Sequence, residues 1–217
     1  MIGLCIGSQN TCIGVLKGNN VDIILSETSS RSIPTMISFT DQERVSGDAA
    51  LSVSKSNFQR TIVSPNRYLG LVNGPIFEQE KKYAFFQPSL DDYYRACFEL
   101  NYKGNNERIT PEGAMGAFLN KVKKYWKKNG YNTKDIVVSV PDYFNCTERQ
   151  AMLDAISMAN LNCTSLINES SAVAINYGLF RRTQFEDTKP RIVGFVDMGQ
   201  CKTSVFFCSY TKNTQKV

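Results

Sequence analysis

Residues 135–179 read DIVVSVPDYFNCTERQAMLDAISMANLNCTSLINESSAVAINYGL. An apolar strand pattern comes first, and a helical pattern with Asn145 or Thr147 as its N-cap follows it. A second strand pattern at 163–168 then leads into a second helical pattern, which we expect to end at Gly178. Strands and helices that alternate in this way are the signature of a parallel sheet flanked by helices. The segment therefore places the chain in the α/β class.

Upstream of this segment, the sequence predicts an antiparallel meander and one long helix. Residues 1–26 contain three short apolar or alternating runs, separated by Gly-Ser-Gln-Asn and Gly-Asn-Asn turns. Residues 33–40, IPTMISFT, predict one further strand. The helix has Thr110 as its N-cap and Gly130 as its closing residue, and its apolar residues recur at helical spacing. We therefore expect one buried face on this helix.

The remaining segments carry weaker signals. Residues 41–70 predict pieces of helix, interrupted by Pro65 and ending at Gly70. Residues 71–108 predict a small peripheral α+β region, and the polar stretch 180–191 predicts a boundary between two lobes. Two strand patterns around a glycine turn follow this boundary, and the chain then ends. We expect that they begin a second lobe, so that the chain is the N-terminal piece of a longer protein.

Composition excludes several classes of function. The chain has 217 residues, a net charge of +5 and no histidine, which excludes Ser-His and Cys-His nucleophile pairs and histidine-ligated zinc. Its seven cysteines form no C-x-x-C pair, and no apolar run approaches the roughly 20 residues of a membrane span. The lysines that end the long helix suit a solvated helix terminus better than a nucleic-acid or membrane patch. We expect a cytoplasmic protein without a signal peptide and without a nucleic-acid or membrane partner.

A strand, glycine turn and strand motif occurs twice in the chain. GLCIGSQNTCIGV at 3–15 and GFVDMGQCKTSVFF at 194–207 both read as an apolar run, a glycine turn and a second apolar run. Such a turn points backbone N–H groups into one concavity, which favours anions. Single glycine hairpins are common, but a matched pair suggests an internal duplication that could clamp a triphosphate from both sides. The candidate binding residues are Gly7, Ser8, Gln9 and Asn10 in the first turn and Gly199, Gln200, Cys201 and Lys202 in the second.

The residues that end the two first strands differ in charge. Asp197 precedes the second turn, where a carboxylate can hold water on a bound Mg²⁺. Cys5 stands at the matching place before the first turn, and a neutral thiol is a poor partner for a hard cation. Cysteine at the end of a buried strand is also explained as a small hydrophobe, without a metal or redox role. The functional point is therefore the missing carboxylate.

These motifs resemble the N-terminal part of the nucleotide-binding domain of the seventy-kilodalton heat-shock chaperones, and most closely their hundred-and-ten-kilodalton relatives. The resemblance is strongest at 137–179, which matches the family's connecting segment almost residue for residue. It extends to the first hairpin, to RSIPTMISF at 31–39 and to VDMG at 196–199. It covers Met1 to about Val217 and is weakest over 71–108.

The resemblance implies an actin-like ATPase fold of the ribonuclease H-like kind, with ATP or ADP and Mg²⁺ between two lobes. Residues 1–34 and 109–186 would form the main subdomain of lobe one. Residues 35–108 would form a small inserted subdomain. Residues 187–217 would be the first hairpin of an incomplete second lobe.

Four positions decide the chemistry that the resemblance implies. Glu169 and Asp197 match acidic residues of the family that orient water and metal. Cys5 replaces the acid of the first hairpin, and Asn66 stands where the family places a catalytic lysine. Loss of one preorganised charge-stabilising donor lowers a rate by about a hundred- to thousand-fold. We therefore predict weak or absent hydrolysis, with binding retained through backbone amides. Lys202 could add charge near the phosphates, but its place in the sequence favours a surface lysine on a strand.

Three functions remain open on this reading. The first is a co-chaperone that acts as a nucleotide exchange factor for a seventy-kilodalton heat-shock partner and contacts unfolded clients through regions beyond this chain. The second is a working ATP-dependent foldase in which other groups replace the missing ones. The third is a protein-binding scaffold that holds no nucleotide. Sugar kinases and actin would share the doubled hairpin, but the connecting segment resembles neither closely.

Overall fold

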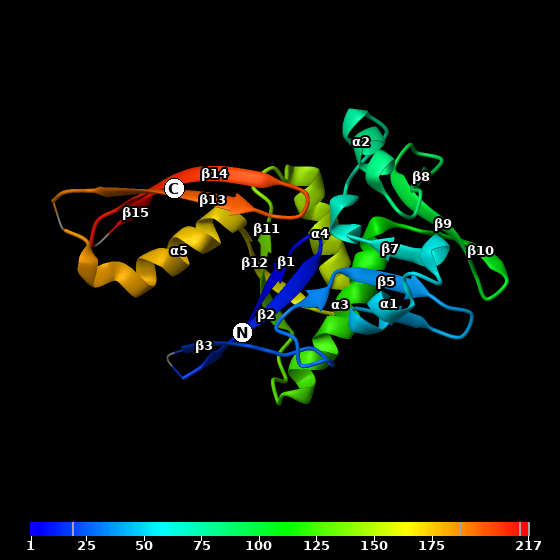
Figure 1. The fold of residues 1–217 in the computed structure, drawn as a ribbon, viewed down its shortest axis with the longest axis horizontal. Helices are drawn as coiled ribbons and strands as arrows, with labels where there is room; N and C mark the ends of the chain where they lie inside the picture. The colour runs from blue at the N-terminus through cyan, green and yellow to red at the C-terminus, as the bar shows by residue number, and fades with distance from the viewer. Residues whose placement is uncertain (19, 187, 213, 217) are drawn as a thin grey trace.

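A computed structural model describes residues 1–18, 20–186, 188–212 and 214–216. The molecule is elongated, with a central sheet between a small inserted region at one end and a long hairpin at the other (Figure 1). None of the helices in the described part of the chain combines the length and apolar character that a membrane span requires.

The central sheet combines a meander with two parallel strands. Strands β1 (Ile2–Ile6), β2 (Asn10–Lys17) and β3 (Asn20–Ile23) form the predicted antiparallel meander. Strand β11 (Asp135–Val140) pairs with β1 in parallel, and β12 (Asn162–Asn168) pairs with β11 in parallel. The order is β12-β11-β1-β2-β3, so the predicted α/β class is confirmed.

Helices α3 (Pro111–Lys128) and α4 (Cys146–Met158) cover one face of this sheet. The predicted cap Thr110 is confirmed, and of the two caps predicted for α4 the structure has Asn145, so the alternative Thr147 is wrong. The Thr110 hydroxyl accepts a hydrogen bond from the Gly113 N–H at 3.1 Å, and Asn145 forms a capping box with Glu148. Inward residues of β1 pack with the buried apolar face of α3, so Cys5, which alternates with them, points to the opposite face.

Helix α5 (Glu169–Arg181) leaves the sheet after β12 and runs three residues beyond Gly178, so the expected end at Gly178 is wrong. Gly178 is buried on the packed side of the helix, where a missing side chain is tolerated in the helix interior. A short 3₁₀ turn, η3 (Arg182–Gln184), follows the helix.

The inserted region contains two small sheets and two short helices. Strand β4 (Ile33–Pro34) pairs with the start of β2 and leads into the region. One sheet holds β5 (Met36–Phe39), β6 (Arg44–Ser46) and β7 (Thr61–Val63), beside α1 (Asp48–Val53) and η1 (Phe58–Arg60). The other holds β8 (Ser89–Leu90), β9 (Ala96–Tyr102) and β10 (Asn105–Ile109), below η2 (Pro65–Arg67) and α2 (Pro75–Tyr83).

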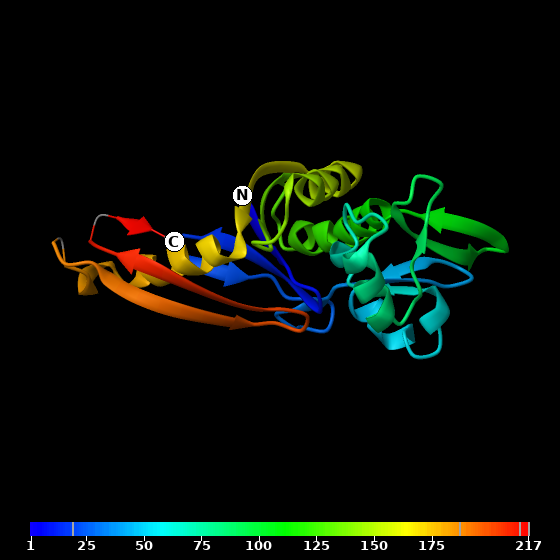
Figure 2. The same ribbon diagram turned by 90° about the horizontal axis from the view of Figure 1, so that it is seen from above.

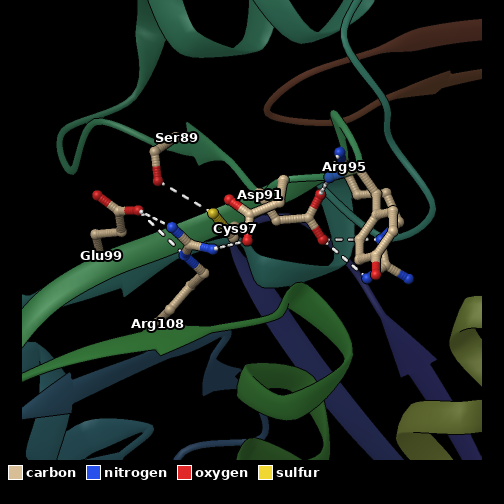
Figure 3. Close-up of polar contacts among 8 residues, drawn as sticks. Ser89, Asp91, Arg95, Cys97, Glu99 and Arg108 are labelled. Atoms are coloured by element: carbon tan, nitrogen blue, oxygen red, sulfur yellow. Dashed lines mark hydrogen bonds and ion pairs between the residues drawn. The ribbon is translucent and has the colours of Figure 1, made fainter.

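Charged pairs hold the outer strands of this region together (Figure 3). Arg95 pairs with Asp91 at 2.8 Å across the turn between β8 and β9, and Arg108 pairs with Glu99 at 3.2 Å across β9 and β10. The predicted small α+β character of residues 71–108 is confirmed.

Two predictions for the inserted region are wrong. The single strand predicted at 33–40 is divided at Thr35, because the Thr35 N–H donates to the Gln9 carbonyl at 2.8 Å instead of continuing a ladder. Residues 61–63 fall in a segment predicted as helix, yet they form β7. The β-branched run Thr-Ile-Val pairs with β5, and this tertiary pairing overrides the local pattern.

The chain ends in a hairpin of β13 (Arg191–Met198) and β14 (Thr203–Tyr210), beside the short β15 (Gln215–Lys216). The hairpin packs on α5 through a third apolar cluster, in which the Tyr210 hydroxyl donates to the Ala174 carbonyl at 2.9 Å. Both views place the tip of this hairpin beside the β1–β2 turn (Figures 1 and 2).

Candidate functional site

A cavity of about 880 Å³ lies where the β1–β2 turn, the β13–β14 turn, η2 and the start of α5 meet. The structure brings all of the candidate site residues together on its wall. They are Cys5, Gly7, Ser8, Gln9, Asn10, Asn66, Glu169, Asp197, Gly199, Gln200, Cys201 and Lys202. The binding and catalytic roles of these residues stay predictions.

Hydrogen bonds within the chain engage the carbonyls of Ser8, Gln9 and Asn10 in the first turn. The Gly7 N–H closes the turn on the Asn10 carbonyl at 3.0 Å, and a Cβ at Gly7 would lie only 2.8 Å from that oxygen. The Gln9 carbonyl accepts from the Thr35 N–H at 2.8 Å, and the Ser8 carbonyl accepts from the Ser64 hydroxyl at 2.5 Å. Within the described residues, no hydrogen bond engages the N–H groups of Ser8 and Gln9. These two donors are therefore available to an anion.

The second turn repeats this geometry. The Gly199 N–H donates to the Lys202 carbonyl at 2.8 Å, which matches the Gly7 to Asn10 bond of the first turn. In the described part of the chain, the N–H groups of Gln200 and Cys201 also donate no hydrogen bond. Four unengaged backbone donors thus border one cavity, two from each turn.

The two acidic candidates lie in different environments. Glu169 is the first residue of α5, and its carboxylate forms an ion pair with Lys202, whose ammonium also lies 5.7 Å from the centre of the Tyr143 ring. Lys202 is therefore part of the cavity wall and not a free surface lysine. The Asp197 carboxylate has no hydrogen bond or ion pair among the described residues, so it is free to accept one.

Cys5 and Asn66 present neutral groups to the same cavity. Cys5 is exposed to the cavity, yet the surrounding walls bury its thiol enough to raise its pKa, and the Glu169 and Asp197 carboxylates add to the rise. Asn66 is only 4% exposed, and its amide donates to the Ile6 carbonyl at 3.4 Å. The Asn66 Oδ1 and the Ser139 hydroxyl, both on this wall, are buried without a partner among the described residues. Unpaired buried polar atoms of this kind fit a polar ligand or ordered water.

The residues of the site that sequence reasoning missed include Thr35 and Ser64, which hold the first turn, and Arg67, Glu80 and Glu148, which line the cavity. Ser64 adopts a left-handed backbone with φ of 53°, and no local pattern indicates this conformation for serine. The signal for Arg67 was its place directly after Asn66, but its partners lie far along the chain.

The residues present fit a polyphosphate bound together with a cation. The four free amides suit phosphate oxygens. Two basic side chains, Arg67 and Lys202, line the cavity together with four acidic ones, Glu80, Glu148, Glu169 and Asp197. This balance disfavours a bare polyanion. In the described residues no group of three or more His, Cys, Asp or Glu could hold a metal directly, so Asp197 fits a cation only through water.

Comparison with known proteins gives a consistent picture. The family model described as Hsp70 protein matches residues 1–217. Heat shock protein 88 of Dictyostelium discoideum is 34% identical over 219 residues, which cover 100% of this chain and 28% of the relative. A heat shock protein homolog of Saccharomyces cerevisiae is 29% identical over 99% of this chain and 32% of the relative. The 97 kDa heat shock protein of Strongylocentrotus purpuratus is 29% identical over 100% of this chain and 25% of the relative.

The chain thus spans between a quarter and a third of the length of these relatives. The family match leaves no part of the chain outside it, and it includes both turns of the cavity and the connecting segment between them. The chain belongs to the Hsp70 family.

Proposed function

We propose that this chain is a nucleotide-binding region that holds ATP or ADP with Mg²⁺ and hydrolyses ATP weakly. The observation that carries the proposal is the pair of matched turns whose four unengaged N–H groups border one cavity. The membership of the Hsp70 family supports it, because that family implies an actin-like ATPase fold.

We also propose a division of the chain into subdomains. Residues 1–34 with 109–186 form the main subdomain, residues 35–108 the insert, and residues 187–217 the start of a second lobe. Two of the three apolar clusters support this division, one below the central sheet and one in the insert, whereas the third joins α5 to the last hairpin across the proposed boundary. The sheet order β3-β2-β1-β11-β12, with an antiparallel meander extended by parallel strands, supports the ribonuclease H-like assignment.

Weak hydrolysis follows from the neutral side chains on the wall. Bound Mg²⁺ would neutralise phosphate charge, and Asp197 would hold its water ligands. The thiol of Cys5 and the amide of Asn66 supply no charge to the reacting phosphate, and Glu169 is already paired with Lys202. Each missing preorganised charge lowers the rate by about a hundred- to thousand-fold.

The test combines calorimetry with steady-state phosphate release in the full chain. We expect saturable binding of ATP and ADP in the presence of Mg²⁺, and release at least about a hundred-fold slower than for an Hsp70-family ATPase with both charged groups. Release at the ordinary family rate would instead support a working foldase. No shift of the melting temperature in millimolar ATP and Mg²⁺ would contradict nucleotide binding and support a scaffold.

We further propose that the whole protein is a cytoplasmic exchange factor for a seventy-kilodalton heat-shock partner, and that regions beyond this chain contact unfolded clients. A cleft that keeps its phosphate donors but carries neutral side chains at Cys5 and Asn66 is suited to a nucleotide-stabilised docking surface. The measurement is the rate of ADP release from a seventy-kilodalton chaperone with and without the protein. An unchanged release rate would contradict this role and would leave nucleotide binding as a separate result.

A further inference from the structure

The short segment from Ser64 to Arg67 in the inserted region contacts both turns of the cavity. Its first residue donates to the Ser8 carbonyl of the first turn, and its last residue donates to the Cys201 sulfur of the second turn. We propose that Arg67 is the phosphate-binding cation of this cleft, a role that rests on the proposed nucleotide binding.

Arg67 reaches the place where the second turn offers its free donors. Its Nη1 lies 2.8 Å from Cys201 Sγ, and the backbone N–H groups of Gln200 and Cys201 belong to the same turn. Its side chain is 21% exposed, and the residue lines the cavity with both turns. A phosphate group that meets these two amides therefore also meets the guanidinium.

The guanidinium of Arg67 has N–H donors that its contacts within the described residues do not use. It carries five N–H groups, and its contacts within the described residues use one Nη1 donor toward Cys201 and one Nη2 donor toward Glu80. A neutral thiol is a weak acceptor, whereas phosphate oxygens accept two parallel hydrogen bonds from arginine. An entering phosphate gains from replacing the sulfur as the partner of Nη1.

The other groups on the wall do not supply this charge. Lys202 is the second basic side chain of the cavity, and the Glu169 carboxylate already holds it. Asn66, directly before Arg67, is uncharged, and its Oδ1 is buried without a partner among the described residues. Among the basic side chains that line the described cavity, Arg67 therefore differs from Lys202 because one of its nitrogens donates to a neutral group, the Cys201 thiol.

Glu80 competes with the phosphate for the same side chain. Its carboxylate pairs with Nη2 of Arg67 and lines the cavity itself. The guanidinium lies at the second turn, where its Nη1 contacts Cys201. We therefore expect it to contact the phosphate groups of a bound nucleoside diphosphate or triphosphate.

The experiment uses Arg67→Gln in the full chain, with Arg60→Gln as the matched control. Arg60 also forms an ion pair, with Asp41, and its side chain is 27% exposed, but it does not line the cavity. Calorimetric titration with ATP and Mg²⁺ should show about 10- to 100-fold weaker binding for Arg67→Gln, the value of one hydrogen bond to a charged group. Arg60→Gln should bind as the wild type does. Circular dichroism and melting without nucleotide report whether each variant folds.

A double-mutant cycle with Glu80→Gln distinguishes direct phosphate binding by Arg67 from the effect of a change in the net charge of the cavity. Removal of the Glu80 charge should raise the affinity for ATP several-fold in the wild-type background and much less in Arg67→Gln. Equal gains in both backgrounds would overturn the role of Arg67, as would unchanged affinity in Arg67→Gln. If the wild type binds no nucleotide, the proposed function itself fails. If the wild type binds nucleotide and Arg67→Gln binds it equally well, only the role of Arg67 fails. Should Arg67→Gln not fold, Arg67→Lys, which keeps the charge and loses the fork, completes the cycle.

Discussion

At the scale of single residues, Cys5 and Asn66 change the charge of the cleft without changing its backbone. Cys5 keeps its place in β1, opposite Cys12 on one side and Ser139 on the other. Asn66 keeps a hydrogen bond to the Ile6 carbonyl at the end of the same strand. Because both side chains border the cavity, a charged replacement could reach the ligand without refolding of the main chain.

The first prediction restores these charges. The double substitution Cys5→Asp with Asn66→Lys should raise steady-state phosphate release by about a hundred-fold or more, because it supplies two preorganised charges to the phosphate. Phosphate release by the full chain is the measurement. The control pair is Cys146→Asp with Asn101→Lys, two exposed positions outside the cavity that receive the same charges. Equal release from both double variants would contradict the explanation of weak hydrolysis.

The second prediction concerns the reactivity of Cys5. Burial raises the pKa of its thiol above the ordinary value of 9.0, so little reactive thiolate is present at neutral pH. Alkylation of Cys5 by iodoacetamide should therefore be slow at pH 7 and should increase as the pH rises beyond 9.0. ATP with Mg²⁺ should protect Cys5 but not the exposed Cys146, as followed by mass spectrometry of the peptides. Rapid, unprotected alkylation of Cys5 at pH 7 would contradict its place in the nucleotide cavity.

At the scale of elements, the sequence predicted what local signals specify. The caps Thr110 and Asn145 and the meander of β1 to β3 follow from short patterns, and the structure confirms them. The break at Thr35 and the contact of Arg67 with Cys201 depend on partners far along the chain, 134 residues away in the second case. No local pattern contains such partners, so the site's supporting residues were missed while its turn residues were identified.

The third prediction tests how the inserted region meets α4. Gly70 has a φ of +67°, and a Cβ there would lie 3.1 Å from backbone atoms of Thr147 and Glu148. Gly18 has a similar φ of +61° with nothing within 4 Å. Either change to alanine should lower the free energy of unfolding by about 1–2 kcal/mol, because alanine is strained in the left-handed backbone conformation. Gly70→Ala should lower it by about 1–3 kcal/mol more, because the added Cβ overpacks the contact with α4. Urea unfolding measures the stability of both variants. Equal losses of stability would contradict the prediction, because they would mean that the inserted region shifts away from α4 without an energetic penalty.

At the scale of the whole molecule, the cleft depends on how the last hairpin sits on α5. The same helix carries Glu169 at its start and packs against Tyr210 further along. The helix therefore carries part of the cavity wall and supports the hairpin that supplies the opposite turn. Figure 2 shows α5 beside this hairpin. The ion pair of Glu169 with Lys202 joins the two at the cavity itself. A ligand that binds both turns stabilises this arrangement, because it contacts elements from each end of the chain.

The charge of the assembled cleft leads to the last prediction. Four acidic side chains and two basic ones line it, so a triphosphate without a cation meets net repulsion. Removal of Mg²⁺ with excess EDTA should weaken ATP binding by about tenfold or more, a difference of about 1.4 kcal/mol. Asp197→Asn should reduce this dependence on Mg²⁺, because it removes the free carboxylate that fits the cation's water shell, whereas Asp154→Asn on the exposed side of α4 should not. Equal affinity for ATP in Mg²⁺ and in EDTA would mean that the amides and Arg67 alone overcome the repulsion, and that the cleft binds phosphate without a cation.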